Sequence, residues 1–199
     1  MFGNLLQQMY NIADTWVVGR YLGSDALAAV GSSYTLMTFL TSIIIGLCMG
    51  SGAAISMQYG SGDSKKMRQS VFMSFCLIAG ISIALNIIVY IGMDFILWAL
   101  QIPNEIQAMM RDYLEIIFLG ITATFLYNYF ANLLRAIGNS VLPLVFLAVS
   151  AVLNVVLDLV CVLVFNWGIK GAAIATVFSE FISAIGIDTV SYTHLTLPT

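Results

Sequence analysis

Two carboxylates lie inside apolar stretches of this sequence, and each follows amides or hydroxyls at helical spacing. Asp14 ends a polar series, spaced mainly three or four residues apart, that comprises Asn4, Gln7, Gln8 and Asn11. Asp158 follows Ser150 and Asn154, each four residues apart. Such spacings place side chains on one face of an α-helix. An ionisable group inside a spanning helix costs roughly 2.5–3.5 kcal/mol on insertion scales, so we interpret both acids as functional.

Two further apolar runs carry polar residues on one face. One run contains Thr176, Ser179, Glu180 and Ser183, and the other contains Asn128 and Asn132. Because no Lys or Arg lies well inside any apolar run, these faces must meet one another or water. We therefore expect a shared anionic cavity that suits protons, sodium or organic cations. The alternative interpretation is that the polar residues only join helices through hydrogen bonds.

The composition of the chain indicates a membrane protein. The 199 residues are 60% hydrophobic and 9% charged, whereas soluble domains carry about 25% charged residues. A net charge of −3 gives no support for nucleic-acid binding. Cys48, Cys76 and Cys161 lie in apolar runs, as packing residues do. The sequence has no metal-ligand cluster and no catalytic signature, so we expect no enzyme, no bound metal and no cofactor other than a coupling ion.

Runs of about 20 mainly apolar residues predict spanning helices. Six such runs cover residues 2–19, 34–57, 71–92, 113–134, 143–165 and 171–187. We predict a short connection over residues 20–33, with a helical turn capped by Ser24-Asp25. A second connection, amphipathic and broken by Pro103, is predicted over residues 94–110. The expected fold class is all-α: a polytopic membrane protein built as a six-transmembrane-helix bundle in a lipid bilayer.

The loop from Gly60 to Arg68 is the most basic part of the chain, and the positive-inside rule places it in the cytoplasm. Alternation of the spans then assigns the remaining basic residues. The inner group is Lys65, Lys66, Arg68 and Arg135, and the outer group is Arg20, Arg111 and Lys170.

Both ends of the chain depart from a complete bundle. The first apolar run begins at Met1 without a polar flank, so we expect the true start to lie upstream and the first helix to be truncated. Residues 188–199 lose apolar character abruptly. We expect them to be an artefactual or disordered tail, separate from a lobe formed by residues 1–187.

The motifs in these runs resemble the multidrug and toxic compound extrusion (MATE) family. The resemblance is carried by Asn-Leu-Leu-Gln-Gln-Met-Tyr-Asn-Ile-Ala-Asp-Thr (4–15), Val-Gly-Arg (18–20), Leu-Gly-Ser-Asp-Ala-Leu-Ala-Ala-Val-Gly (22–31), Gln-Tyr-Gly-Ser-Gly-Asp (58–63), Leu-Arg-Ala-Ile-Gly-Asn (134–139) and Leu-Asn-Val-Val-Leu-Asp (153–158). It covers about residues 1–187. The sequence is most similar to the bacterial branch with an Asp in both helix one and helix five.

The resemblance implies a twelve-helix antiporter of two six-helix lobes, of which residues 1–187 are the N-terminal lobe. It implies export of cationic or amphipathic drugs across the bacterial inner membrane in exchange for H⁺ or Na⁺, with a C-terminal lobe as the missing partner. By motif position, the ion-coupling residues are Asp14, Asn132, Asn154, Asp158 and Thr176. Helical spacing adds the candidate cavity-lining residues Gln8, Asn11, Ser150 and Glu180.

Two other functions stay open. A flippase for lipid-linked sugars shares the superfold, but its cavity should carry buried Arg or Lys for anionic lipid phosphates, and no span of this sequence does. A non-transporting membrane scaffold subunit would use the polar residues only as helix contacts.

Overall fold

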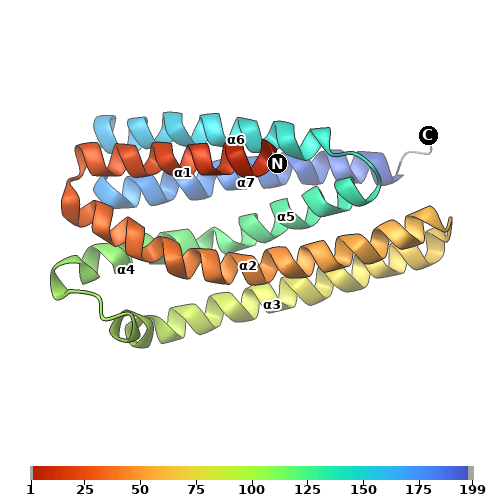
Figure 1. Cartoon of the computed structure of the whole chain (residues 1–199), viewed down its shortest axis with the longest axis horizontal. Helices are drawn as coiled ribbons and strands as arrows, with labels where there is room; N and C mark the ends of the chain where they lie inside the picture. Colours follow the sequence, from red (N-terminus) through yellow and green to blue (C-terminus); the bar gives the residue numbers. More distant parts are fainter. Residues whose placement is uncertain (1, 197–199) are drawn as a thin grey trace.

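The computed structural model describes residues 2–196, and the side chains of residues 8, 9 and 11–191 (Figure 1). This part of the chain is helical throughout, with short turns, as the all-α prediction requires. The helices are α1 (Phe2–Tyr21), α2 (Ser24–Gly60), α3 (Ser64–Ala99), α4 (Asn104–Leu119), α5 (Ile121–Ala136), α6 (Val141–Leu159), the π-helical turn η1 (Val160–Val164) and α7 (Gly168–Thr196).

Six segments run through the bundle in alternating directions, which confirms the six-helix architecture. Among the described residues, α2, α3, α6 with η1, and α7 are each long and apolar enough to cross a membrane. Helices α4 and α5 form a further crossing segment that is bent by 42°. Helix α1, with 20 residues, lies beside α6 and runs in the same direction. The chain is therefore an integral membrane protein.

The segments lie in two groups. Helices α1, α6 and α7 pack together, and α2, α3, α4 and α5 form the other group (Figure 1). The second group is held by aromatic rings in tilted and edge-to-face contact, including those of Phe75, Phe125 and Tyr129. The Tyr129 hydroxyl donates to the carbonyl of Val71 at 2.6 Å. Helix α7 bridges the groups, because it contacts α4 and α5 as well as α6.

Two predicted connections are wrong, because the helices continue past their apolar runs. Helix α2 begins at Ser24, so only Leu22 and Gly23 separate it from α1, and Gly23 makes this turn with φ +90°. No side chain caps α2, so the predicted Ser24-Asp25 cap is also wrong. Helix α3 reaches Ala99, which reduces the connection over 94–110 to residues 100–103. Each residue added to an existing helix gains a backbone hydrogen bond, so a helix need not stop where hydrocarbon ends.

The segment predicted as one span over residues 113–134 is two helices that meet at Gly120. The Gly120 N–H donates to the carbonyl of Ile117 at 2.8 Å, one residue closer than in an α-helix. A Cβ at Gly120 would lie 2.8 Å from Val177 Cγ2 of α7 and 2.9 Å from the Ile117 oxygen. The bend therefore needs glycine, because α7 packs directly on its backbone.

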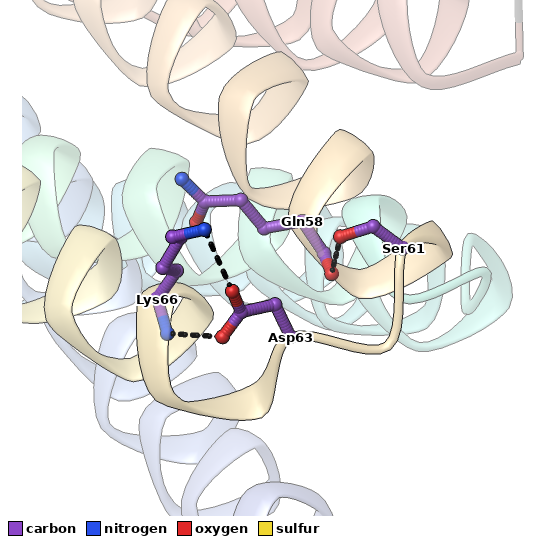
Figure 2. A network of polar contacts seen from close by, with 4 residues as sticks. All are labelled: Gln58, Ser61, Asp63 and Lys66. Atoms are coloured by element: carbon purple, nitrogen blue, oxygen red, sulfur yellow. Dashed lines mark hydrogen bonds and ion pairs between the residues drawn. The ribbon is translucent and has the colours of Figure 1, made fainter.

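The predicted basic loop over residues 60–68 is shorter than expected, because α2 ends at Gly60 and α3 begins at Ser64. Residues 61–63 form a tight turn (Figure 2), and Lys65, Lys66 and Arg68 lie in the first turns of α3. The Asp63 carboxylate caps α3 by accepting the Lys66 backbone N–H at 3.0 Å, and it pairs with Lys66 Nζ at 2.9 Å. Ser61 Oγ donates to the Gln58 carbonyl at 2.9 Å at the end of α2. The backbone and side-chain hydrogen bonds from Lys66 hold the pKa of Asp63 below its usual range.

The basic residues divide between the two ends of the bundle as predicted. The α2–α3 and α5–α6 turns lie at one end, and the other three turns lie at the opposite end (Figure 1). At that opposite end Arg111 pairs with Asp94, and Lys170 Nζ lies 3.2 Å from Asp112 Oδ2. Which end faces the cytoplasm stays a prediction.

Helix α7 is longer than the predicted sixth span. It begins at Gly168 and continues through residue 196, nine residues past Ile187. Residues 197–199 lie outside the described residues. The expectation that residues 188–199 are foreign to the lobe stays a prediction.

Candidate functional site

The two intramembrane carboxylates meet between α1 and α6. Asp14 is 8% exposed and Asp158 is fully buried, and their carboxyl groups lie close enough to interact electrostatically. Helices α1 and α6 place them together because both acids lie on the face that each helix turns toward the other. Two carboxylates so close repel each other unless a proton or a cation lies between them.

Asn154 and Thr176 extend the site onto α7. Asn154 lies one helical turn before Asp158 and is 1% exposed. Its Nδ2 donates to Thr176 Oγ1 at 3.1 Å, and that hydroxyl donates in turn to the Ala172 carbonyl at 3.1 Å. Since the Thr176 hydrogen is used on its own helix, its oxygen is left to accept the amide. The carbonyl oxygen of Asn154 is consequently free for another partner.

Four buried oxygens of this cluster have no hydrogen-bond donor among the described residues. They are Asp14 Oδ1, Asp158 Oδ1, Asp158 Oδ2 and Asn154 Oδ1. Buried acceptors without donors are costly and rare in folded proteins. A proton or a cation with oxygen ligands would satisfy them, and carboxylate and amide oxygens are hard donors of the kind such cations prefer. The described residues hold no group of three or more His, Cys, Asp and Glu side chains that could bind a metal ion.

The helix backbone changes directly after Asp158. Residues 160–164 form a π-helical turn, in which the Phe165 N–H donates to the Val160 carbonyl at 3.0 Å. Helix α7 comes close to this turn at Gly171, where a Cβ would lie 3.1 Å from Cys161 Cβ and 3.2 Å from its carbonyl carbon and oxygen. Single π-turns inside α-helices often occur at functional sites. Here the turn fixes the end of α6 against α7 within one turn of the acid.

Asn132 and Asn128 do not join the acid cluster. Their Nδ2 atoms donate along α5 to the carbonyls of Asn128 and Thr124, both at 2.8 Å. Asn132 also packs on Gly52 of α2, where its Cβ would be 3.4 Å from an added methyl group. The coupling role expected for Asn132 stays a prediction without a contact to Asp14 or Asp158 in the described structure.

Glu180 forms a second polar contact, with a residue that the sequence did not single out. Its Oε2 accepts the hydroxyl of Thr124 on α5 at 2.7 Å. Thr124 lies four residues before Asn128, so helical spacing could have placed it on the same polar face. The neighbouring hydroxyls of α7 serve local packing: Ser179 Oγ donates to the Thr176 carbonyl at 2.8 Å, and Ser183 Oγ donates to the Phe146 carbonyl at 3.1 Å.

The remaining candidate residues are less buried than the two acids. Gln8 is exposed, and Asn11 and Ser150 are partly buried. The carbonyl of Asn11 accepts the Thr15 hydroxyl at 2.7 Å. A groove of about 550 Å³ runs along α6 instead, lined only by apolar side chains that include Val145, Val149 and Val152. This apolar groove is not the predicted anionic cavity, because Asp14 and Asp158 are buried between helices and do not line it. The anionic cavity stays a prediction.

A family model supports the motifs in these helices. The MatE family model matches residues 1–160, a range that contains Asp14, Asn132, Asn154 and Asp158. Thr176 and Glu180 lie beyond it.

Curated relatives match almost the whole chain but are longer. A probable multidrug resistance protein of Bacillus subtilis (strain 168), YpnP, is 35% identical over 183 residues, which are 92% of this chain and 41% of the relative. The probable multidrug resistance protein NorM of Thermotoga maritima is 26% identical and is 40% covered. The multidrug export protein MepA of Staphylococcus aureus is 29% identical and is 41% covered. The chain thus spans less than half the length of these relatives.

Solved structures share the fold. An outward-facing multidrug resistance MATE family transporter of the MOP superfamily superposes with a TM-score of 0.91 at 23% identity, covering 98% of this chain and 43% of that one. A MOP superfamily transporter from Pyrococcus furiosus gives the same TM-score, identity and coverage. Each solved chain continues well beyond the part that this bundle matches.

Proposed function

Because this chain belongs to the MatE family, we propose that it is the N-terminal lobe of a cation-coupled multidrug efflux antiporter. The remainder of the transporter is a C-terminal lobe, since the matched relatives are more than twice as long. The substrates are cationic or amphipathic compounds, and the coupling ion is H⁺ or Na⁺. We place the protein in the cell (inner) membrane of a bacterium; the matched relatives from Bacillus and Staphylococcus are named as multidrug resistance or export proteins.

The observation that carries the proposal is the set of four buried oxygens without donors at Asp14, Asn154 and Asp158. Desolvation disfavours a charged carboxylate, and two adjacent carboxylates disfavour each other's charge. The cluster is therefore stable only when it holds a positive charge or a proton. This is the property that a coupling site needs.

Antiport follows if the coupling ion and the drug favour different states of the transporter. Binding of H⁺ or Na⁺ neutralises Asp14 and Asp158, whereas the ionised pair attracts an organic cation. A ligand shifts a conformational equilibrium only by its difference in affinity for the two states. We infer that the neutralised cluster favours the state that releases drug outside, and that the ionised cluster favours the state that takes it up inside.

The flippase alternative is less well supported. An anionic lipid phosphate would need buried Arg or Lys, and the described basic residues lie at the ends of the bundle. The scaffold alternative predicts polar side chains satisfied by neighbouring helices, as Ser183 is by the Phe146 carbonyl of α6. It does not account for the donorless oxygens between Asp14, Asn154 and Asp158.

The test is drug efflux in proteoliposomes that contain the full-length protein. A fluorescent organic cation is loaded inside, and a proton gradient or a sodium gradient is imposed separately. We expect efflux that depends on one of these gradients and stops when an ionophore collapses it. Absence of efflux under both gradients, with folded and correctly inserted protein, would reject the antiporter proposal.

A further inference from the structure

The proposed coupling cluster does not use Glu180, an acid in the middle of α7. Glu180 lies on α7, one turn after Thr176, and ten residues from Lys170, which is about 15 Å along the helix axis. That depth is near the middle of a hydrocarbon core about 30 Å thick. Glu180 interacts with α5 through Thr124, whereas Asp14 and Asp158 face each other between α1 and α6. Glu180 is therefore a separate site.

The Thr124 hydroxyl sits between two acceptors. Its oxygen lies 2.7 Å from Glu180 Oε2 on α7 and 3.2 Å from the Gly120 carbonyl on its own helix. A hydroxyl has one hydrogen to donate. It can therefore satisfy only one of the two oxygens at a time, and the charge of Glu180 decides which one.

The second acceptor belongs to the bend between α4 and α5. Gly120 is the residue at which these helices turn by 42°, and Val177 of α7 packs on it. Helix α3 holds the α4 side of the bend, where Asn86 donates to the Phe118 carbonyl and Tyr90 donates to the Glu115 carbonyl. Helix α7 holds the α5 side through Glu180 and Thr124. Contacts with α3 and α7 thus fix the bend on its two sides. The contact with α7 depends on Glu180, a group that can gain or lose a proton.

Several ionisable groups on the helices around α7 have partners other than Glu180. Asp112 of α4 pairs with Lys170, and the Tyr127 hydroxyl of α5 donates to the Pro143 carbonyl at 2.8 Å. Asp14 of α1 and Asp158 of α6 interact with each other. Arg135 is exposed at the end of α5. The partner that the structure gives Glu180 is the neutral Thr124.

We propose that Glu180 is a second proton-binding site, which controls the stiffness of the α4–α5 bend through Thr124. When Glu180 is ionised, Thr124 donates to it in a charge-assisted hydrogen bond that ties α5 to α7. When Glu180 takes up a proton, its own O–H donates to Thr124 Oγ1. Thr124 then turns its hydrogen to the Gly120 carbonyl, and the tie becomes a weaker bond between neutral groups. Proton uptake therefore loosens the bend.

Two measurements test the proposal in the full-length protein in lipid nanodiscs. The first is the carboxylic acid C=O band in infrared difference spectra across a pH titration. A band that disappears in Glu180→Gln and persists in Asp14→Asn and Asp158→Asn would assign a proton to Glu180.

The second measurement is the distance between spin labels at positions 105 and 135, which are exposed on α4 and α5. A bend of 42° makes this separation about 3 Å shorter than in a straight helix of the same length, at 1.5 Å per residue.

We expect one narrow distance distribution at high pH, and a broader one at the pH where Glu180 is protonated. Glu180→Gln, which can only be neutral, should give the broad distribution at every pH, and so should Thr124→Val. Thr124→Ser keeps the hydroxyl and should retain the pH response, and so should Asp14→Asn. Distributions that respond to pH equally in wild type and Glu180→Gln would overturn the proposal, as would an infrared band that Glu180→Gln does not change. Because no readout depends on transport, the proposal can fail while the proposed function stands, and the reverse also holds.

Discussion

The side-chain amide of Asn154 points its nitrogen at Thr176 and its oxygen away from it. The Nδ2–Oγ1 distance is 3.1 Å, and Thr176 spends its own hydrogen on the Ala172 carbonyl. Thr176 of α7 therefore orients the Asn154 amide of α6, so that its oxygen is the atom left available beside the two acids. The cluster becomes a set of acceptors only because this hydroxyl is oriented by its own helix.

Thr176→Val should disturb the site without removing an acid. The valine leaves Asn154 Nδ2 buried without its acceptor, at a cost of about 1–3 kcal/mol, and the amide is then free to rotate. We expect weaker binding of the coupling ion, measured as a higher ion concentration for half-maximal efflux, and a lower thermal midpoint. Thr176→Ser is the matched control, because it keeps the hydroxyl. Equal ion dependence in both variants would show that the orientation of Asn154 does not matter.

Asp14→Asn and Asp158→Asn should each abolish gradient-driven drug efflux while the protein stays folded. The amide mimics the protonated acid, so the site can no longer exchange a cation for a drug. Asn154→Ala should weaken efflux less, since both acids remain. Asp25→Asn, at an exposed position outside the cluster, is the control and should transport normally. Full gradient-driven efflux in both aspartate variants would make these carboxylates structural.

Gly120→Ala should destabilise the protein. The added methyl group would lie 2.8 Å from Val177 Cγ2 and 2.9 Å from the Ile117 oxygen, and such overpacking costs about 1–3 kcal/mol. Gly80→Ala in α3 meets no atom within 4 Å and should be neutral or slightly stabilising, by up to about 1 kcal/mol from helix propensity. Thermal unfolding in one detergent compares the two. A Gly120→Ala protein as stable as Gly80→Ala would mean that the bend yields easily.

Ionised Asp63 should stabilise the folded protein at pH values above its folded-state pKa, but not below it. Its pKa is lowered in the folded state by hydrogen bonds from Lys66, so the ionised form is the one that folding favours. The stabilisation is present above the unfolded pKa of about 3.9 and is lost as the pH falls through the lower folded pKa. We expect wild type to exceed Asp63→Asn slightly in thermal midpoint at pH 7, and the difference to shrink as the pH falls below about 3.9. A difference that does not change with pH would contradict this assignment.

The α2–α3 turn should lie in the cytoplasm. Single cysteines at the exposed positions 65 and 170, at opposite ends of the bundle (Figure 1), can be labelled with a membrane-impermeant thiol reagent on intact cells. Position 170 should react and position 65 should react only after the membrane is opened, as the basic loop implies. The opposite pattern would invert the orientation.

The sequence by itself determined the helices and the polar face of each one. The four-residue spacing of Asn154 and Asp158, and the apolar runs around them, follow from helix geometry and from the cost of burying charge, which are local properties. The family motifs are likewise read along the chain. Fold class and the acid positions were therefore predictable, whereas the exact ends of α2 and α3 were not, because helix propagation is not limited by hydropathy.

Only the tertiary structure decided which polar faces meet. Asn132 and Glu180 have the same kind of spacing as Asn154, yet Asn132 bonds along α5 and Glu180 bonds to Thr124. The bend at Gly120 could not be predicted from the sequence, because a glycine in an apolar run is compatible with a straight helix. The contact with Val177 of α7, which an added methyl group would block, is visible only in the structure. Partner choice depends on how α1, α5, α6 and α7 are rotated and spaced. That arrangement is set by the packing of the whole bundle, and no periodicity within a single helix encodes it.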